Sequence, residues 1–239
     1  MSDAPYLNTD QMREVDRAMI EDYHIELIQM MENAGRNLAH LARSRFLDGD
    51  PRGRKVVVLA GRGGNGGGGL VCARRLHNWG ADVRVLATHP DARYQGVPGR
   101  QLDILRRMDV PVATPDAVPD DPELIVDAII GYSLAGAPRG TAAQLINWAN
   151  AQTAPILSLD APSGLDTTTG TVYEPAIRAT ATMTLALPKD GLREGTAGEA
   201  IIGELYLADI SVPPGLYAGP GLRLEVGPLF AREEIVRLR

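Results

Sequence analysis

The sequence has little cysteine, no excess of basic residues and no long hydrophobic run, and each absence excludes a class of protein. Its 239 residues include one cysteine, Cys72, which cannot form an internal disulfide and lies in an apolar helical pattern, as a small core residue would. The formal net charge of −6 argues against a nucleic-acid or anionic-membrane partner. The N-terminus has no apolar signal segment, and no run approaches the length of a membrane span. We therefore expect a cytoplasmic protein that does not bind membranes.

The apolar residues that are present recur with two different periods along the chain. Helical spacing predicts two opening helices within residues 9–45, the first carrying Met12, Val15 and Met19 on one face. Short apolar runs that alternate with helical patterns then predict a doubly wound α/β fold with a mostly parallel sheet. The predicted strands are Lys55–Ala60, Val83–Ala87, Leu124–Ile130, Ile156–Leu159, Thr182–Leu187 and Ile201–Leu207. We expect one domain over residues 1–239, with its core at about 54–213 and an irregular tail at about 214–239.

Polar or glycine-rich turns follow four of the predicted strands. These turns are Gly61–Gly69, the segment from Asp127 to Gly136, the segment from Asp160 to Asp166, and Pro188–Gly191. Ligands of open α/β sheets bind at the carboxyl ends of the strands, so the four turns together predict a small-molecule site.

The glycine-rich turn allows two familiar interpretations, and both fit poorly. Gly61, Gly63 and Gly66 match the dinucleotide fingerprint G-x-G-x-x-G, but no acidic residue ends the second predicted strand, which disfavours an oxidoreductase. Leu70 stands where a Walker loop needs its lysine. The histidines lack metal-ligand spacing.

Five motifs, taken in order, resemble one family. They are Met31–Gly35 (MENAG), Gly63–Leu70 (GGNGGGGL), Asp127–Leu134 (DAIIGYSL), Ser158–Asp166 (SLDAPSGLD) and Ala208–Pro213 (ADISVP). In this order they resemble the YjeF N-terminal domain family, the NAD(P)H-hydrate epimerases. The resemblance implies a three-layer Rossmann-like α/β/α fold, commonly as a homodimer. It also implies interconversion of the R and S forms of NADHX and NADPHX, with a separate dehydratase as functional partner because no fused dehydratase domain is expected here.

The resemblance also implies roles for individual residues. Asn65, Asp127 and Ser163 match positions that bind a potassium ion. Substrate contacts are implied for Gly64, Asn65, Gly66, Gly67, Gly68, Gly131, Tyr132, Ser133, Leu134, Ala135, Gly136, Ala137 and Asp160.

The chemistry of the reaction favours a carboxylate at the site. The hydroxylated carbon lies next to the ring nitrogen, so loss of hydroxide gives a flat iminium that water can attack from either face. We expect Asp160 to act as acid on departure and as base on return. Lys189 could stabilise phosphate or a developing negative charge, although a lysine at a strand end is more often solvated.

Two positions depart from the family pattern. Gly64 replaces an asparagine and Gly68 an aspartate, so the segment loses potential hydrogen bonds to substrate. This leaves an altered epimerase as the predicted function, and a catalytically silent nucleotide-binding or interaction module as the alternative.

Overall fold

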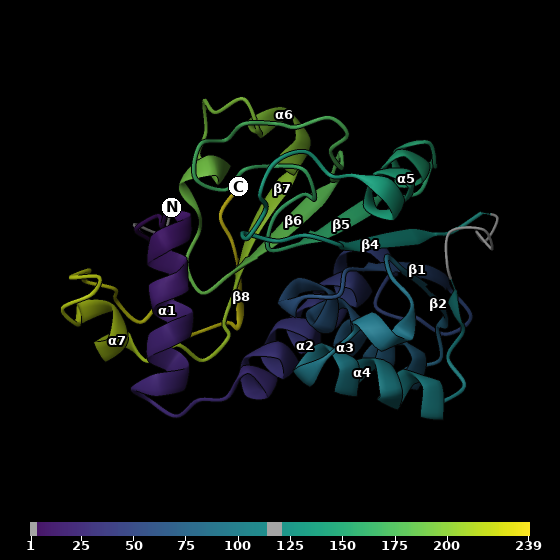
Figure 1. Ribbon diagram of the computed structural model, residues 1–239, viewed down its shortest axis with the longest axis horizontal. Coiled ribbons are helices and arrows are strands. Elements are labelled where there is room, and N and C mark those ends of the chain that lie inside the picture. Colours follow the sequence, from purple (N-terminus) through teal and green to yellow (C-terminus); the bar gives the residue numbers. More distant parts are fainter. Residues whose placement is uncertain (1–3, 114–120) are drawn as a thin grey trace.

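The computed structural model describes residues 4–113 and 121–239, which form an eight-stranded sheet with helices on both faces (Figure 1). The strands are β1 (Lys55–Ala60), β2 (Asp82–Ala87), β3 (Val112–Ala113), β4 (Leu124–Ala128), β5 (Ile156–Leu159), β6 (Ala181–Leu185), β7 (Glu204–Ala208) and β8 (Ile235–Arg237). Their order across the sheet is β3-β2-β1-β4-β5-β6-β7-β8. Every neighbouring pair is parallel except β7 with β8. The strand order reverses between β1 and β4, which is the kind of place where such sheets bind ligands.

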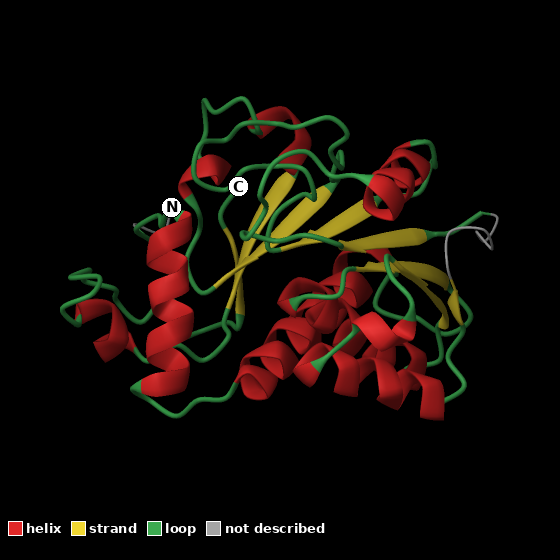
Figure 2. Cartoon of the chain, viewed as in Figure 1, coloured by secondary structure: helices red, strands yellow, loops and turns green. Residues whose placement is uncertain are grey.

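The helices divide between the two faces of the sheet (Figure 2). They are α1 (Thr9–Glu21), α2 (Leu27–Phe46), α3 (Gly64–Asn78), α4 (Gly96–Arg107), α5 (Gly140–Asn150), α6 (Glu199–Ile202) and α7 (Pro214–Ala218), with single 3₁₀ turns at Asp91–Arg93 and Asp190–Leu192. Helices α2, α3 and α4 share a core with Val56 and Val58 of β1, whereas α5 packs with Val57 and Leu59. Because both faces of β1 are covered, the strand reads as an unbroken apolar run. The predicted three-layer α/β/α fold is confirmed.

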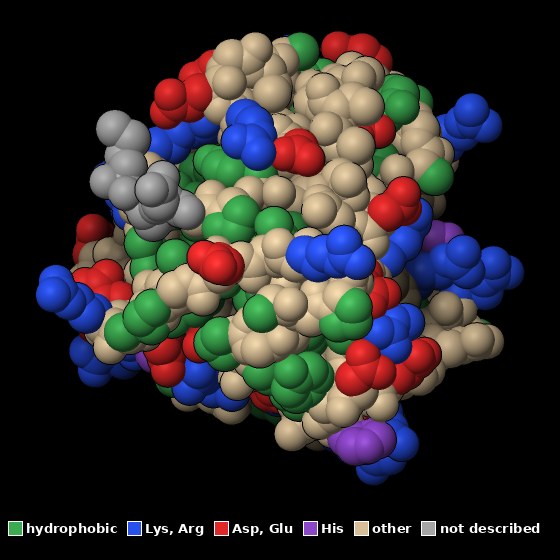
Figure 3. All heavy atoms as spheres, turned by 90° about the vertical axis from the view of Figure 1, so that its left-hand side faces the viewer, with side chains coloured by type: hydrophobic (Ala, Val, Ile, Leu, Met, Phe, Trp, Pro, Cys, Tyr) green, Lys and Arg blue, Asp and Glu red, His purple; other side chains and the backbone are tan. Residues whose placement is uncertain are grey.

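Helix α1 lies outside this sandwich and packs with the C-terminal segment. Met12, Val15 and Met19 form a second core with Leu216 and Tyr217 of α7, among others. On the side of the molecule that carries α1 and α7, basic and acidic side chains are interspersed rather than gathered by sign (Figure 3). None of the helices in the described residues combines the length and the apolar composition needed to cross a membrane.

Two expectations about the C-terminal third were wrong. The strand predicted from Ile201 begins only at Glu204, because residues 199–202 form α6 and Gly203, at φ 65°, turns the chain between the two elements. The segment predicted as irregular contains α7 and β8, and β8 pairs antiparallel with β7. Elements this short are stabilised by tertiary contacts rather than by their own periodicity.

Candidate active site

A cavity of about 300 Å³ lies at the carboxyl ends of the central strands. Its walls come from the segments that follow β4 and β5, from the first turn of α3, and from α1 and α2. The lining residues are Met12, Asp16, Leu27, Met30, Met31, Ala34, Gly64, Asn65, Gly68, Gly131, Tyr132, Ser133, Leu159, Asp160, Leu185 and Ile210. The lining is mostly apolar with a few convergent polar groups, which is typical of a small-molecule site.

The structure brings some of the predicted substrate-binding residues to this cavity and leaves others outside it. Those that line it are Gly64, Asn65, Gly68, Gly131, Tyr132, Ser133 and Asp160, whereas Gly66, Gly67, Leu134, Ala135, Gly136 and Ala137 do not. The side chain of Asn65 is also available for a ligand. Its Nδ2 is buried and has no hydrogen-bond partner among the described residues.

The glycine-rich segment is a helix start rather than a loop. Helix α3 begins at Gly64, so the loop predicted to reach Gly69 ends at Gly63. A Cβ on Gly66 would overlap the carbonyl oxygen of Gly61, and one on Gly67 would overlap the side chain of Met31. Glycine is therefore required at position 66, where α3 packs against the backbone that follows β1. Among the glycines of this run, Gly64 and Gly68 line the cavity.

Leu159 packs against Gly68, the glycine that replaces the family's aspartate. A Cβ on Gly68 would come within 2.8 Å of Cδ2 of Leu159, which lies on β5. The leucine side chain thus fills the space into which a side chain at position 68 would extend. By contrast, a Cβ on Gly64 would meet no atom within 4 Å.

Asp160 follows β5 and adopts a left-handed conformation, φ 67°, that turns its carboxylate into the cavity wall. Its Oδ1 accepts a hydrogen bond from Nζ of Lys189 at 2.5 Å, and its Oδ2 accepts one from the backbone N–H of Tyr132 at 2.9 Å. Lys189 is fully buried and also donates to Oγ1 of Thr184 and to the carbonyl of Leu185. The sequence left open whether Lys189 is solvated or stabilises charge, and in the structure it is buried and forms an ion pair with Asp160.

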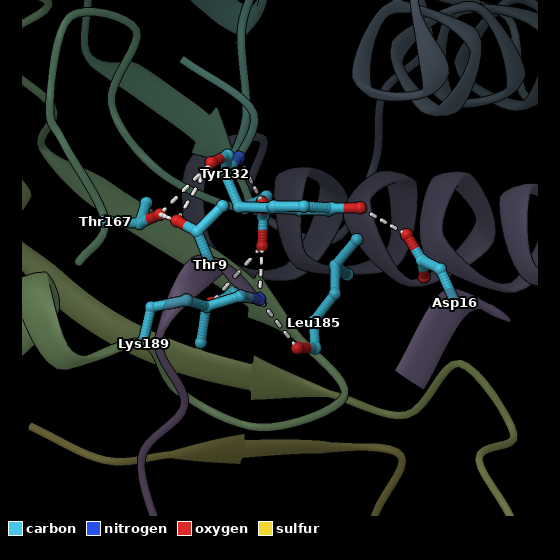
Figure 4. Close-up of polar contacts among 8 residues, drawn as sticks. Thr9, Asp16, Tyr132, Thr167, Leu185 and Lys189 are labelled. Carbon is cyan, nitrogen blue, oxygen red and sulfur yellow. Dashed lines mark hydrogen bonds and ion pairs between the residues drawn. The ribbon is translucent and has the colours of Figure 1, made fainter. Parts of the chain in front are cut away.

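Sequence reasoning missed a second carboxylate in the cavity, Asp16 on α1. The hydroxyl of Tyr132 donates a short hydrogen bond to Oδ2 of Asp16, and Figure 4 shows the Tyr132 side chain extending toward Asp16, away from Lys189. Burial raises the pKa of the Asp16 carboxyl above its usual range, although the hydrogen bond from Tyr132 acts in the opposite direction. One signal was present in the sequence. Asp16 follows Met12 by four residues and precedes Met19 by three, so it is a carboxylate on the apolar face of its helix.

The N-terminal segment is positioned beside this site by backbone pairing. Leu7 forms a parallel bridge with Lys189, and its amide donates to the carbonyl of Pro188 at 2.9 Å. The hydroxyl of Thr9 lies 3.3 Å from that of Thr167 (Figure 4). The start of α1 is therefore attached to the turn that carries Lys189, which places Asp16 at the cavity.

The three predicted potassium ligands are only partly assembled. Asp127 is fully buried and accepts hydrogen bonds from the Ser163 hydroxyl at 2.6 Å and from the Ser163 amide at 2.8 Å. Further donors are the Ser158 hydroxyl and the amide of Ile129. Burial raises the pKa of Asp127, and no ion-pair partner lies beside it in residues 4–113 and 121–239. Asn65 is not among the hydrogen-bond partners of Asp127 or Ser163 in that part of the chain.

Comparison with known proteins identifies the family of the chain. The family model described as "YjeF-related protein N-terminus" matches residues 27–191. The chain belongs to this family.

Named relatives match most of the chain. It is 43% identical to an NAD(P)H-hydrate epimerase of Dehalogenimonas lykanthroporepellens, over 92% of this chain and 87% of the relative. It is 39% identical to a bifunctional NAD(P)H-hydrate repair enzyme of Salinibacter ruber, over 88% of this chain but 41% of that enzyme. The crystal structure of the yeast protein ynu0 matches with a TM-score of 0.79 at 27% identity, covering 98% of this chain and 100% of the yeast chain.

Proposed function

We propose that this family member is an NAD(P)H-hydrate epimerase that interconverts the R and S forms of NADHX and NADPHX. The observation that carries the proposal is the position of Asp160, a carboxylate on the cavity wall held by the buried Lys189 and by the Tyr132 amide. The names of the relatives at 37–43% identity support the same activity. The cavity volume of about 300 Å³ is at the lower end for small-molecule sites and suits the hydrated nicotinamide ring rather than a whole dinucleotide.

The reaction needs little more than positioned proton transfer. The ring nitrogen lone pair expels the neighbouring hydroxyl as water once that oxygen is protonated, and a water molecule then adds to the flat iminium from the other face. A carboxylate at the cavity wall can take the proton from the attacking water. The apolar walls supplied by Met12, Met30 and Met31 would limit the water that reaches the ring.

The potassium ion is part of the proposal, with Asn65, Asp127 and Ser163 as its ligands. In support, Asp127 is a fully buried carboxylate with no neighbouring cation among the described residues, and its surroundings offer hydroxyl and carbonyl oxygens. Potassium would supply the missing positive charge there. Ser163 would remain the residue that fixes the turn after β5 to the end of β4, since its amide and hydroxyl both donate to Asp127.

The proposal includes a separate dehydratase as functional partner. A relative named as a bifunctional NAD(P)H-hydrate repair enzyme, in which one chain would carry out both repair steps, supports it. The homodimer and the cytoplasmic location stay predictions. Light scattering of the purified chain at several concentrations checks the dimer.

The decisive assay mixes the chain with R-NADHX and a dehydratase that acts only on the S form. Recovery of NADH faster than in the dehydratase-only reaction is expected. The Asp160→Asn variant should lose this acceleration, whereas Asp166→Asn, in the same turn but with its carboxylate bonded to the amides of Thr168 and Thr169, should keep it.

Two outcomes would contradict the proposal. Binding of NADHX without acceleration would make the chain a silent nucleotide-binding module, for which Gly64 and Gly68 would then be the first residues to examine. Tight binding of intact NAD without binding of NADHX would favour an oxidoreductase instead.

A further inference from the structure

The cavity contains two carboxylates, and they lie at opposite ends of one tyrosine. The backbone amide of Tyr132 donates to Oδ2 of Asp160, while its phenol hydroxyl donates to Oδ2 of Asp16. Both carboxylates line the cavity, so a bound ring would lie between or beside two groups that can exchange protons. Figure 4 shows the tyrosine extended between the Lys189 region and Asp16.

The two carboxylates have different surroundings. Asp160 is in a buried ion pair with Lys189 and accepts two further hydrogen bonds, from Tyr132 and from the Thr184 hydroxyl. Asp16 has no ion-pair partner among the described residues, and within that part of the chain only its Oδ2 accepts a hydrogen bond.

The charged groups that act on Asp16 have opposing effects and leave burial as the main influence. Through their charges, Lys189 lowers its pKa and Asp160 raises it. Arg13, one turn away on α1, acts on the Tyr132 phenol, whose pKa burial also raises. The net result is a raised pKa for Asp16, so its protonated form is favoured more than that of an exposed aspartate.

We propose that Asp16 is a second catalytic residue, which exchanges a proton with the substrate on the ring face opposite to the one served by Asp160. This inference rests on the proposed epimerase function. Epimerisation requires departure of the hydroxyl from one face and addition of water to the other. A single carboxylate fixed to one wall reaches only one face, whereas two carboxylates at the two ends of Tyr132 reach both.

The proton balance of the step is simple. Asp16 gives its proton to the hydroxyl oxygen, the C–O bond breaks with its electron pair on oxygen, and water leaves while the ring nitrogen forms the C=N⁺ bond. A water molecule on the other face forms the new C–O bond and gives one proton to the Asp160 carboxylate. In the reverse direction Asp160 gives the proton and Asp16 takes one. Between successive turnovers in the same direction, solvent returns a proton to Asp16 and takes one from Asp160.

The test compares Asp16→Asn with the wild-type chain in both directions, starting from each pure epimer. Loss of a positioned acid or base lowers rates by roughly 10²- to 10⁴-fold, so kcat should fall by at least about 100-fold in each direction while KM changes little. The matched control is Asp10→Asn, because Asp10 is an exposed carboxylate on the same helix and, among the described residues, its ion-pair partner is Arg13. Its kcat should match that of the wild type.

A pH profile separates a proton-transfer role from a purely structural one. In the direction in which Asp16 gives the proton, wild-type kcat should fall as the pH rises through the pKa of Asp16 in the complex. This alkaline decline should be absent from the residual activity of Asp16→Asn. Asp16→Glu, which keeps an acid at the position, should recover part of the lost kcat even if the shape of the site is altered. Thermal unfolding checks that Asp16→Asn is folded. If it is not, Asp16→Glu replaces it in the test.

The outcomes for the two proposals are distinguishable. A wild-type chain that does not accelerate epimerisation would overturn the proposed function and this inference with it. An active wild type with Asp16→Asn within about threefold of its kcat, or with an unchanged alkaline decline, would overturn only the role of Asp16.

Discussion

Replacing Gly66 by alanine should destabilise the protein strongly, whereas the same change two residues earlier should not. A Cβ on Gly66 would overlap the carbonyl oxygen of Gly61, and even the Gly61 amide nitrogen would be only 2.8 Å away. Both atoms belong to the backbone that follows β1, so no side-chain rotation can relieve the overlap and α3 must move away from the sheet. Overpacking against movable side chains costs about 1–3 kcal/mol, so we expect about 3 kcal/mol or more here.

The matched control is Gly64→Ala. No atom lies within 4 Å of the Cβ position of Gly64, and the residue is the first of α3. Alanine is favoured over glycine in helices by up to about 1 kcal/mol, so this variant should be as stable as the wild type or slightly more stable.

Thermal and urea unfolding measure both effects. For a chain of this length each kcal/mol corresponds to about 2–4 °C in Tm, so Gly66→Ala should lower Tm by about 6–12 °C or more. If Gly66→Ala and Gly64→Ala unfolded within about 0.5 kcal/mol of each other, the close approach of α3 to the end of β1 would not be a constraint on the fold, and the argument for the glycine run would fail.

Three further predictions address the charged groups. Lys189→Met should lower the free energy of unfolding by about 3–5 kcal/mol, because it leaves the Asp160 carboxylate buried without its cation. Adding Asp160→Asn should recover part of that loss. If the two changes in unfolding free energy were additive, the ion pair would not contribute to stability. Potassium chloride should raise Tm more than choline chloride at equal concentration. With potassium at ten times its dissociation constant, the extra stabilisation should be about 1.4 kcal/mol, and Asn65→Ala should reduce it. Hydrogen bonds from Arg45 hold the pKa of Glu204 at about 2, below its ordinary value of 4.5. The stabilisation from the Arg45–Glu204 pair is therefore present above about pH 4.5 and is lost as the pH falls toward 2. Glu204→Gln should be less stable than wild type by about 0.5 kcal/mol at neutral pH, and this difference in stability should disappear at acidic pH. A difference that persists at acidic pH would refute the role given to the pair.

The sequence alone predicted the layered fold because the signals that define it are local. A buried parallel strand needs an unbroken apolar run, and residues 55–60 and 156–159 have one, so both strands were predicted with the bounds that the structure shows. The order of motifs also located the turns after β1, β4 and β5, and with them Asp160.

What the sequence could not give was the contacts between distant segments. Whether the glycines from Gly66 to Gly68 form a flexible loop or a packed helix start depends on how close β1 and α2 approach, which no local pattern records. Whether Lys189 is solvated or buried depends on Leu7, far away in the chain, pairing with it.

For Asp16, the sequence determined one part of its position and the tertiary structure determined the other. The spacing of Met12 and Met19 determined that its helix has an apolar face and that Asp16 lies on it. Only the tertiary structure decided that this face closes over the ends of the central strands, where Tyr132 meets the carboxylate. Helical period is a property of neighbouring residues and is encoded in the sequence itself, whereas the pairing of α1 with a turn more than 100 residues later depends on the free energy of packing the whole chain.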